Sequence, residues 1–211
     1  MLIKFTVGNY RSFKEKQTLS MLATKVGGQE ECVREVGKYK LLTSAAIYGA
    51  NASGKSNLIQ AMKFALKLIL NPSFVFGDYS VIDVAPFRLA EQTYDKPSYF
   101  EFIFIENKTI YRYGFEVSAS KITKEWLYHT PTSRESLLFE RQDNTITLRS
   151  RLSGEKKLTE KTRFNHLFLS VLADFNNQLA DKLMNSFNNM LVILGVDDSE
   201  FFQKAKQSLE N

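Results

Sequence analysis

The sequence predicts an α/β fold, because strand-like and helix-like segments follow one another along its 211 residues. An apolar run from residue 41 to residue 48 has the composition of a buried parallel strand and ends at a glycine. After Lys55, apolar residues recur at helical spacing until the pair Asn71-Pro72 ends the predicted helix. Between residues 99 and 149, extended runs separated by turn residues predict an antiparallel meander of about five strands.

The two ends of the chain add further elements to this prediction. Residues 2–7 alternate as in a strand, residues 9–13 form a predicted turn, and residues 17–22 form a second extended run. The polar segment 27–37 is expected to be a loop. From residue 163 to residue 189, apolar residues recur at steps of three and four, which predicts a C-terminal helical segment.

Composition is that of an ordinary globular protein, with 44% hydrophobic and 24% charged residues. No apolar run reaches the roughly 18 residues that a membrane span needs, so no membrane contact is expected. The opening residues MLIKFTVGNY lack the features of a signal peptide, and the single cysteine, Cys32, cannot form an internal disulfide. These features predict a cytoplasmic location and argue against a metal site of the Cys/His type.

The net charge of +5 permits contact with nucleic acid without establishing it. One stretch is denser in basic residues than the rest: Arg149, Arg151, Lys156, Lys157, Lys161 and Arg163. A solvated loop is the simpler interpretation of this stretch, and a surface that contacts phosphates is the alternative.

One segment of eight residues fits the pattern G-x-x-x-x-G-K-[ST] at every fixed position. It comprises Gly49, Ala50, Asn51, Ala52, Ser53, Gly54, Lys55 and Ser56. Its glycines allow a tight turn whose backbone N–H groups converge on phosphate oxygens. The Lys55 ammonium is placed to neutralise the β- and γ-phosphates, and the Ser56 hydroxyl can ligate Mg²⁺.

The position of this pattern between a predicted strand and a predicted helix indicates a P-loop, a phosphate-binding loop. ATP is the expected ligand. GTP is less favoured, because Asn107-Lys108 lacks the rest of the guanine-reading motif N-K-x-D. A glycine-containing turn that binds nothing is the alternative interpretation.

Several segments together resemble ABC-type ATPase heads of the RecF, Rad50 and SMC kind. They are Asn9-Tyr10-Arg11-Ser12-Phe13, Thr18-Leu19-Ser20, the loop Gly49–Asn57 and, more weakly, Pro86-Phe87-Arg88-Leu89 and the hairpin Phe100–Tyr113. Within that group the chain is most similar to a bacterial family of AAA-labelled ATPases linked to abortive infection and phage defence.

The resemblance implies a nucleotide site formed by residues 49–57 together with Arg11, which uses ATP and Mg²⁺. It also implies ATP-dependent formation of a homodimer, or pairing with a complementary ATPase half, in a DNA-linked or phage-defence system. An exposed turn arginine without a role is the alternative for Arg11. Gln92 is the nearest candidate for the glutamine that helps to hold Mg²⁺ and water in such heads. The alternative function is a non-catalytic module that docks a nuclease or toxin partner.

Two motifs of ABC heads have only imperfect counterparts. The segment Leu152–Lys156 resembles a signature loop that lacks one glycine, and Leu191–Asp198 resembles a Walker B strand with interruptions. The chain is therefore expected to be the N-terminal part of an ABC-type ATPase domain, without identified catalytic residues. A complete miniature head, in which both segments are genuine counterparts, is the alternative. Its expected parts are residues 1–72 with the P-loop and its helix, residues 73–150 with the meander, and residues 151–211 with the helical segment.

Overall fold

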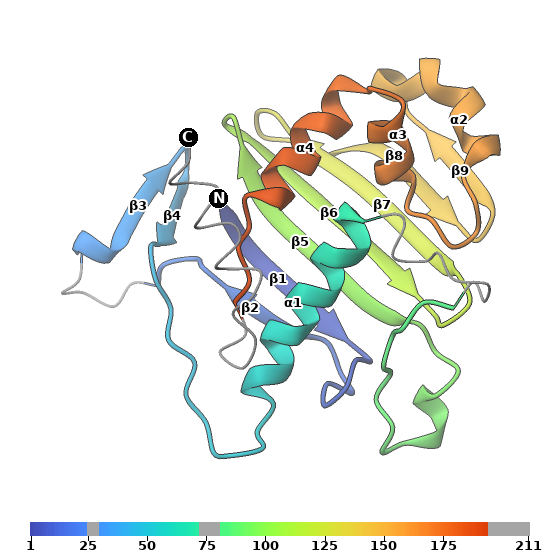
Figure 1. Cartoon of the computed structure of the whole chain (residues 1–211). Coiled ribbons are helices and arrows are strands. Elements are labelled where there is room, and N and C mark those ends of the chain that lie inside the picture. The colour runs from blue at the N-terminus through green and yellow to red at the C-terminus, as the bar shows by residue number, and fades with distance from the viewer. Residues whose placement is uncertain (25–29, 72–80, 194–211) are drawn as a thin grey trace, which may run out of the picture.

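The computed structural model of the chain describes residues 1–24, 30–71 and 81–193. A seven-stranded sheet carries helices on one of its faces, and a separate β-hairpin lies beside the first strand (Figure 1). The α/β class predicted from the sequence is confirmed, and its layers are compatible with a P-loop NTPase-like fold. In the described ranges, no helix combines the length and apolarity that crossing a bilayer requires.

All neighbouring strands of the large sheet are antiparallel, in the order β2-β1-β5-β6-β7-β8-β9. These strands are β1 (Leu2–Gly8), β2 (Gln17–Ser20), β5 (Ser98–Glu106), β6 (Thr109–Val117), β7 (Ile122–Thr130), β8 (Ser136–Gln142) and β9 (Thr145–Leu148). Strands β5 to β9 confirm the predicted meander, and β1 and β2 confirm the two N-terminal runs.

The prediction of a parallel strand before the P-loop is wrong for the described residues. Strands β3 (Val33–Val36) and β4 (Tyr39–Leu42) pair antiparallel in a hairpin of their own, partly inside the segment expected to be a loop. Residues 43–50 are exposed and irregular, so the apolar run forms a strand only at its beginning. A parallel strand is buried when other strands flank it, and no described strand lies parallel to this run.

The face of the sheet that carries helices is covered by α1 (Lys55–Leu70), α3 (Phe168–Asp174) and α4 (Gln178–Asn188) (Figure 1). The short α2 (Lys156–Lys161) follows the 3₁₀ helix η4 (Ser150–Glu155) near the β9 edge. The described residues also include the 3₁₀ turns η1 (Glu30–Cys32) and η3 (Glu91–Thr93). The helix predicted after Lys55 is confirmed and ends at Leu70.

The predicted C-terminal helical segment is divided into two main helices. Asn176 has a positive φ of 61°, which a continuous α-helix does not accommodate. The Asn177 side chain then accepts hydrogen bonds from the N–H groups of Leu179 and Ala180 and caps α4. The apolar spacing predicted the helices correctly, but the local turn chemistry of the two asparagines divides them.

Aromatic side chains fill the space between the sheet and the helices. Phe100, Phe102 and Phe104 of β5 are fully buried. The ring of Phe187 on α4 lies 5.4 Å from Phe102 and 5.0 Å from Phe104, between centroids. Phe64 on α1 lies 5.3 Å from Phe100. Contacts of this kind stabilise the core beyond area burial alone, and here they anchor both long helices on one central strand.

A buried carboxylate holds the start of α3 on the sheet. Glu125 of β7 accepts hydrogen bonds from the N–H groups of Phe168 (2.6 Å) and Leu169 (3.0 Å) and from the Tyr113 hydroxyl (2.9 Å). Burial raises the pKa of Glu125, and the charge of Arg141 and these three donors oppose that rise. The buried Arg141 guanidinium itself donates to three backbone carbonyls. The network therefore compensates the charges that it buries.

Candidate functional site

The loop between β4 and α1 ends in a compact turn at the N-terminus of α1. The Ser53 N–H donates to the Ala50 carbonyl at 3.2 Å, and Ala52 has a positive φ of 63°. Gly54 is the N-cap residue, and no side chain of the described chain caps the helix there. The first N–H groups of an α-helix have no partner within the helix. The start of α1 therefore offers donors and a positive dipole end to an anion.

Lys55 folds back onto the start of the loop. Its Nζ donates to the carbonyl of Gly49 at 2.7 Å and to that of Ala50 at 2.6 Å, and lies 3.5 Å from Ser53 Oγ. In the described chain, no carboxylate pairs with this ammonium. Charge-assisted hydrogen bonds to anionic oxygens are stronger than those to neutral carbonyls. A phosphate can therefore displace the two carbonyls that now hold Lys55.

Close contacts explain both glycines of the pattern. A Cβ on Gly49 would lie 2.7 Å from Ser53 Oγ, and a Cβ on Gly54 would lie 2.7 Å from Ser12 Oγ. Gly54 also has a φ of +95°, which side chains of L-residues disfavour. The second glycine thus lets Ser12 approach the N-terminus of α1.

The turn at residues 9–13 is tied to the segment that precedes β5. The buried Asn9 side chain donates to the carbonyls of Thr93 (3.0 Å) and Lys96 (2.8 Å) and accepts from the Phe87 N–H (3.2 Å). Asn9 has a positive φ of 46°, a conformation in which asparagine is enriched. This one side chain therefore fixes the turn against residues 87–96.

The same turn reaches the first turn of α1. Asn57 Nδ2 donates to Ser12 Oγ at 2.9 Å, and the buried ring of Tyr10 lies 5.6 Å from that of Phe64. Arg11 is exposed, and its Nε donates to the Tyr10 hydroxyl at 3.3 Å. Burial raises the pKa of Tyr10, so this hydroxyl stays neutral. The turn that carries Arg11 thus lies beside the candidate loop, while contact of Arg11 with a nucleotide stays a prediction.

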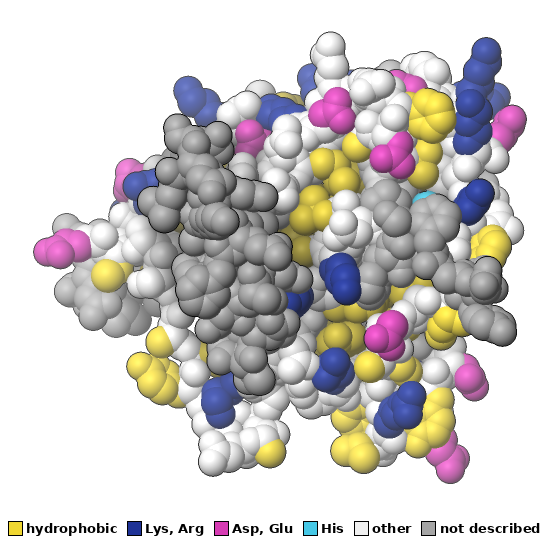
Figure 2. Space-filling model, viewed as in Figure 1, with side chains coloured by type: hydrophobic (Ala, Val, Ile, Leu, Met, Phe, Trp, Pro, Cys, Tyr) yellow, Lys and Arg dark blue, Asp and Glu magenta, His cyan; other side chains and the backbone are white. Residues whose placement is uncertain are grey.

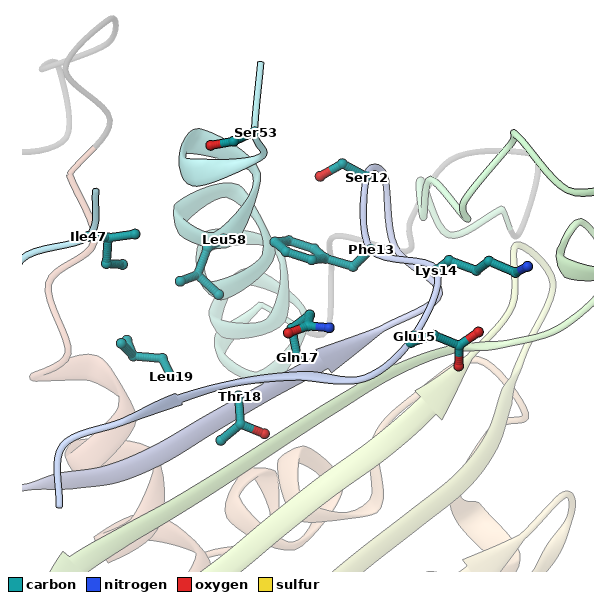
Figure 3. A pocket seen from close by; sticks show the side chains of 10 residues that line it. All are labelled: Ser12, Phe13, Lys14, Glu15, Gln17, Thr18, Leu19, Ile47, Ser53 and Leu58. Atoms are coloured by element: carbon teal, nitrogen blue, oxygen red, sulfur yellow. The ribbon is translucent and has the colours of Figure 1, made fainter. Parts of the chain in front are cut away.

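A pocket of about 620 Å³ opens between this turn, β2 and the loop, within the usual range for small-molecule sites (Figure 3). Ser12 and Ser53 lie at its rim beside the start of α1. Leu19, Ile47 and Leu58 point toward one another and form an apolar part of its wall. The rim is therefore suited to polar groups and the interior to an apolar or planar one.

Ser56 is exposed in the first turn of α1. No group of three His, Cys, Asp or Glu side chains that could hold a metal occurs in the described part of the chain. A hydroxyl oxygen suits Mg²⁺, which keeps several waters and binds phosphate oxygens in nucleotide sites. Ser56 thus fits the part of a single protein ligand to Mg²⁺, and this assignment stays a prediction.

The sequence matches one protein family over residues 44–208, more than three quarters of the chain. The family is described as "AAA domain, putative AbiEii toxin, Type IV TA system". The chain belongs to this AAA domain family. The match confirms the resemblance to AAA-labelled ATPases linked to abortive infection, and it indicates nucleotide binding at the level of the family. No curated protein matches this AAA domain.

The signature-like segment does not join the candidate loop. Residues 152–156 form the end of η4 and the start of α2, far from the N-terminus of α1 (Figure 1). Residues 191–193 are irregular. The rest of the Walker B-like run lies outside the described residues, as does the part of the predicted segment 151–211 from residue 194 on. Gln92 is exposed on η3.

Sequence reasoning did not assign roles to Asn9 and Ser12, although both lie in the turn singled out by resemblance. Their contacts join segments about 45 to 90 residues apart, namely Ser12 to Asn57 and Asn9 to Lys96. The available signal was the residue type, because asparagine tolerates positive φ and serine is small enough for a close approach. Neither property reveals the distant partner.

Proposed function

We propose that the chain binds ATP with Mg²⁺ at Gly49–Asn57. The observation that carries the proposal is the position of the Lys55 ammonium, 2.6–2.7 Å from two loop carbonyls and next to the uncapped start of α1. A triphosphate entering there would meet one positive charge, a helix N-terminus and the N–H groups of a glycine-containing turn. These are the features that phosphate binding requires.

Binding is expected to proceed by exchange of partners. The Lys55 ammonium leaves the carbonyls of Gly49 and Ala50 for the β- and γ-phosphate oxygens. Ser56 would supply a hydroxyl ligand to Mg²⁺, and the metal would help to neutralise the phosphate charge. Arg11, exposed on the neighbouring turn, adds a second positive charge on the side of Ser12.

Hydrolysis by the described residues alone is not expected. Activation of water needs a general base, and Glu15, the carboxylate among the pocket residues, points away from the loop (Figure 3). We therefore propose that ATP binding promotes pairing with a second copy or with a complementary ATPase half, which completes the site. The family description, which names a putative AbiEii toxin of a Type IV TA system, supports a role in abortive infection. A nuclease, toxin or DNA is the further partner that we propose.

Nucleotide binding is tested by titrating the purified chain with a fluorescent ATP analogue in the presence of Mg²⁺. The Lys55→Ala variant should bind about 10- to 100-fold more weakly, because it loses charge-assisted hydrogen bonds of about 1.5–3 kcal/mol. Lys38→Ala removes an equal charge from the exposed β3–β4 turn and should leave the affinity unchanged. A folded Lys55→Ala protein with the parent affinity would contradict the proposal.

The same titration with and without Mg²⁺ tests Ser56. Ser56→Ala should remove most of the gain in affinity that Mg²⁺ gives and leave metal-free binding intact. ATP turnover by the isolated chain then distinguishes the two functional candidates. A turnover rate per molecule that rises with protein concentration supports an ATPase head that pairs. Nucleotide binding without any turnover, even with added partner protein, favours a non-catalytic docking module.

A further inference from the structure

A dense group of cations remains outside the proposed nucleotide site. The segment from Arg149 to Arg163, here named the basic corner, contains six Lys or Arg residues and two Glu residues. Its net charge of +4 is close to the +5 of the whole chain. The corner includes η4 and α2 and lies at the opposite end of the molecule from the start of α1 (Figure 1).

The fold turns these cations outward. Leu152 and Leu158 are buried and anchor η4 and α2 on the core. Lys157 and Lys161 are exposed and stand four residues apart on α2, which places them on one helix face about 6 Å apart along the axis. Arg149, Arg151, Lys156 and Arg163 are exposed as well. The dark blue side chains of this corner are visible at the upper right of Figure 2.

The cations of the basic corner are not neutralised within the described residues. None of the six forms an ion pair there. Of the two acids of the segment, Glu155 accepts a hydrogen bond from Asn177 Nδ2 at 2.9 Å, which directs it toward α4. Concentrated like charge without internal partners raises the electrostatic potential of this surface and attracts polyanions.

An exposed aromatic ring adjoins the cations. Phe175, at the C-terminus of α3, is 51% exposed, and Lys161 Nζ lies 4.9 Å from its ring centroid. Cations beside an exposed aromatic ring are the combination with which proteins bind single-stranded nucleic acids, through phosphate contacts and base stacking. An acidic protein or an anionic membrane would use the same charges, whereas base stacking is the contact that this ring offers to a single strand in particular.

We propose that the basic corner binds single-stranded nucleic acid, with phosphates on the exposed lysines and arginines and a base stacked on Phe175. The proposal does not depend on nucleotide binding at the P-loop, and it is tested without ATP. If four to six cations engage phosphates, the logarithm of the binding constant falls with the logarithm of salt concentration with a slope of about −3 to −4.

The experiment measures fluorescence anisotropy of a labelled mixed-sequence oligonucleotide of about 20 nucleotides, longer than common site sizes, over a series of salt concentrations. The variant Lys157→Gln/Lys161→Gln should reduce the slope by about 1.4 and weaken binding at 0.1 M salt about 25-fold. Lys38→Gln/Lys108→Gln is the matched control: it changes the net charge equally on the exposed β3–β4 and β5–β6 turns. Phe175→Ala should weaken single-strand binding about fivefold or more and affect duplex binding little.

Four outcomes overturn the proposal. The first is no salt-dependent binding by the parent chain, and the second is an equal loss in the control variant. The third is binding of anionic lipid vesicles through the same lysines without binding of the oligonucleotide. The fourth is an affinity for polyglutamate that matches the oligonucleotide and is insensitive to Phe175→Ala, since a site for acidic protein would then explain all the data.

Discussion

Replacing Gly54 with alanine should destabilise the protein by two separable mechanisms. Alanine at a φ of +95° costs about 1–2 kcal/mol of backbone strain. The new Cβ would also lie 2.7 Å from Ser12 Oγ, so the exposed Ser12 hydroxyl must rotate away and lose its hydrogen bond from Asn57, which costs about 0.5–1 kcal/mol. The free energy of unfolding of Gly54→Ala should therefore fall by about 1.5–3 kcal/mol, measured by urea denaturation at 25 °C.

Ser12→Ala provides the means to separate the two mechanisms. Without the hydroxyl, the nearest atom of residue 12 to the new Cβ is its own Cβ at 3.7 Å, an ordinary contact. The single variant Ser12→Ala loses only an exposed hydrogen bond from Asn57, about 0.5–1 kcal/mol. Both single variants lose the same hydrogen bond, so the double variant should be more stable than the sum of the single effects predicts by about 0.5–1 kcal/mol. Strict additivity of the two substitutions would refute the assignment of the close contact.

Three further predictions concern the rest of the molecule. Glu125→Gln should lower the free energy of unfolding by about 1.5–3 kcal/mol, because it weakens the hydrogen bonds that the carboxylate accepts from Phe168 and Leu169 and removes the negative charge near the buried Arg141. Glu140→Gln on the exposed face of β8 is the control in thermal unfolding. The hydrogen bond from Arg112 lowers the pKa of Glu135 below its usual 4.5, so this pair stabilises the fold above pH 4.5 and the contribution disappears as the pH falls through the folded-state pKa. In Glu135→Gln, the decrease in the free energy of unfolding between neutral and acidic pH should therefore be slightly smaller than in the parent protein. Asn9→Ala should cost about 2–4 kcal/mol, since buried carbonyls lose their donor and the positive φ is retained, and hydrogen exchange should become faster in residues 87–96.

The sequence predicted which segments form helices and strands better than it predicted which of these elements pair or pack with one another. Turn chemistry and alternation identify the meander, because hairpins such as Phe100–Tyr113 pair residues that are close in sequence. The helix after Lys55 follows from its apolar spacing and the Asn71-Pro72 stop. The strand expected at residues 41–48 was wrong beyond Leu42, because burial of that run depends on neighbouring strands and not on its own composition.

The sequence pattern alone located the candidate loop, but it did not predict which residues surround the loop. The fixed positions Gly49, Gly54 and Lys55 predict a loop of the phosphate-binding type. The contact between Ser12 and Asn57 and the clamp formed by Asn9 depend on how β1 approaches α1, which is decided by packing across the whole sheet. Long-range contacts of this kind leave no periodic signal in one sequence.

The lengths of the strands also limit how the protein can associate. The central strands β5, β6 and β7 have nine residues each, but the outermost strands, β2 and β9, have four each. Unpaired backbone groups at a sheet margin are a template on which other chains can add, and a short margin presents few of them. The long, aromatic-rich strands lie between these short edge strands. Growth of the sheet into fibrous aggregates is therefore disfavoured as long as the native order of strands persists.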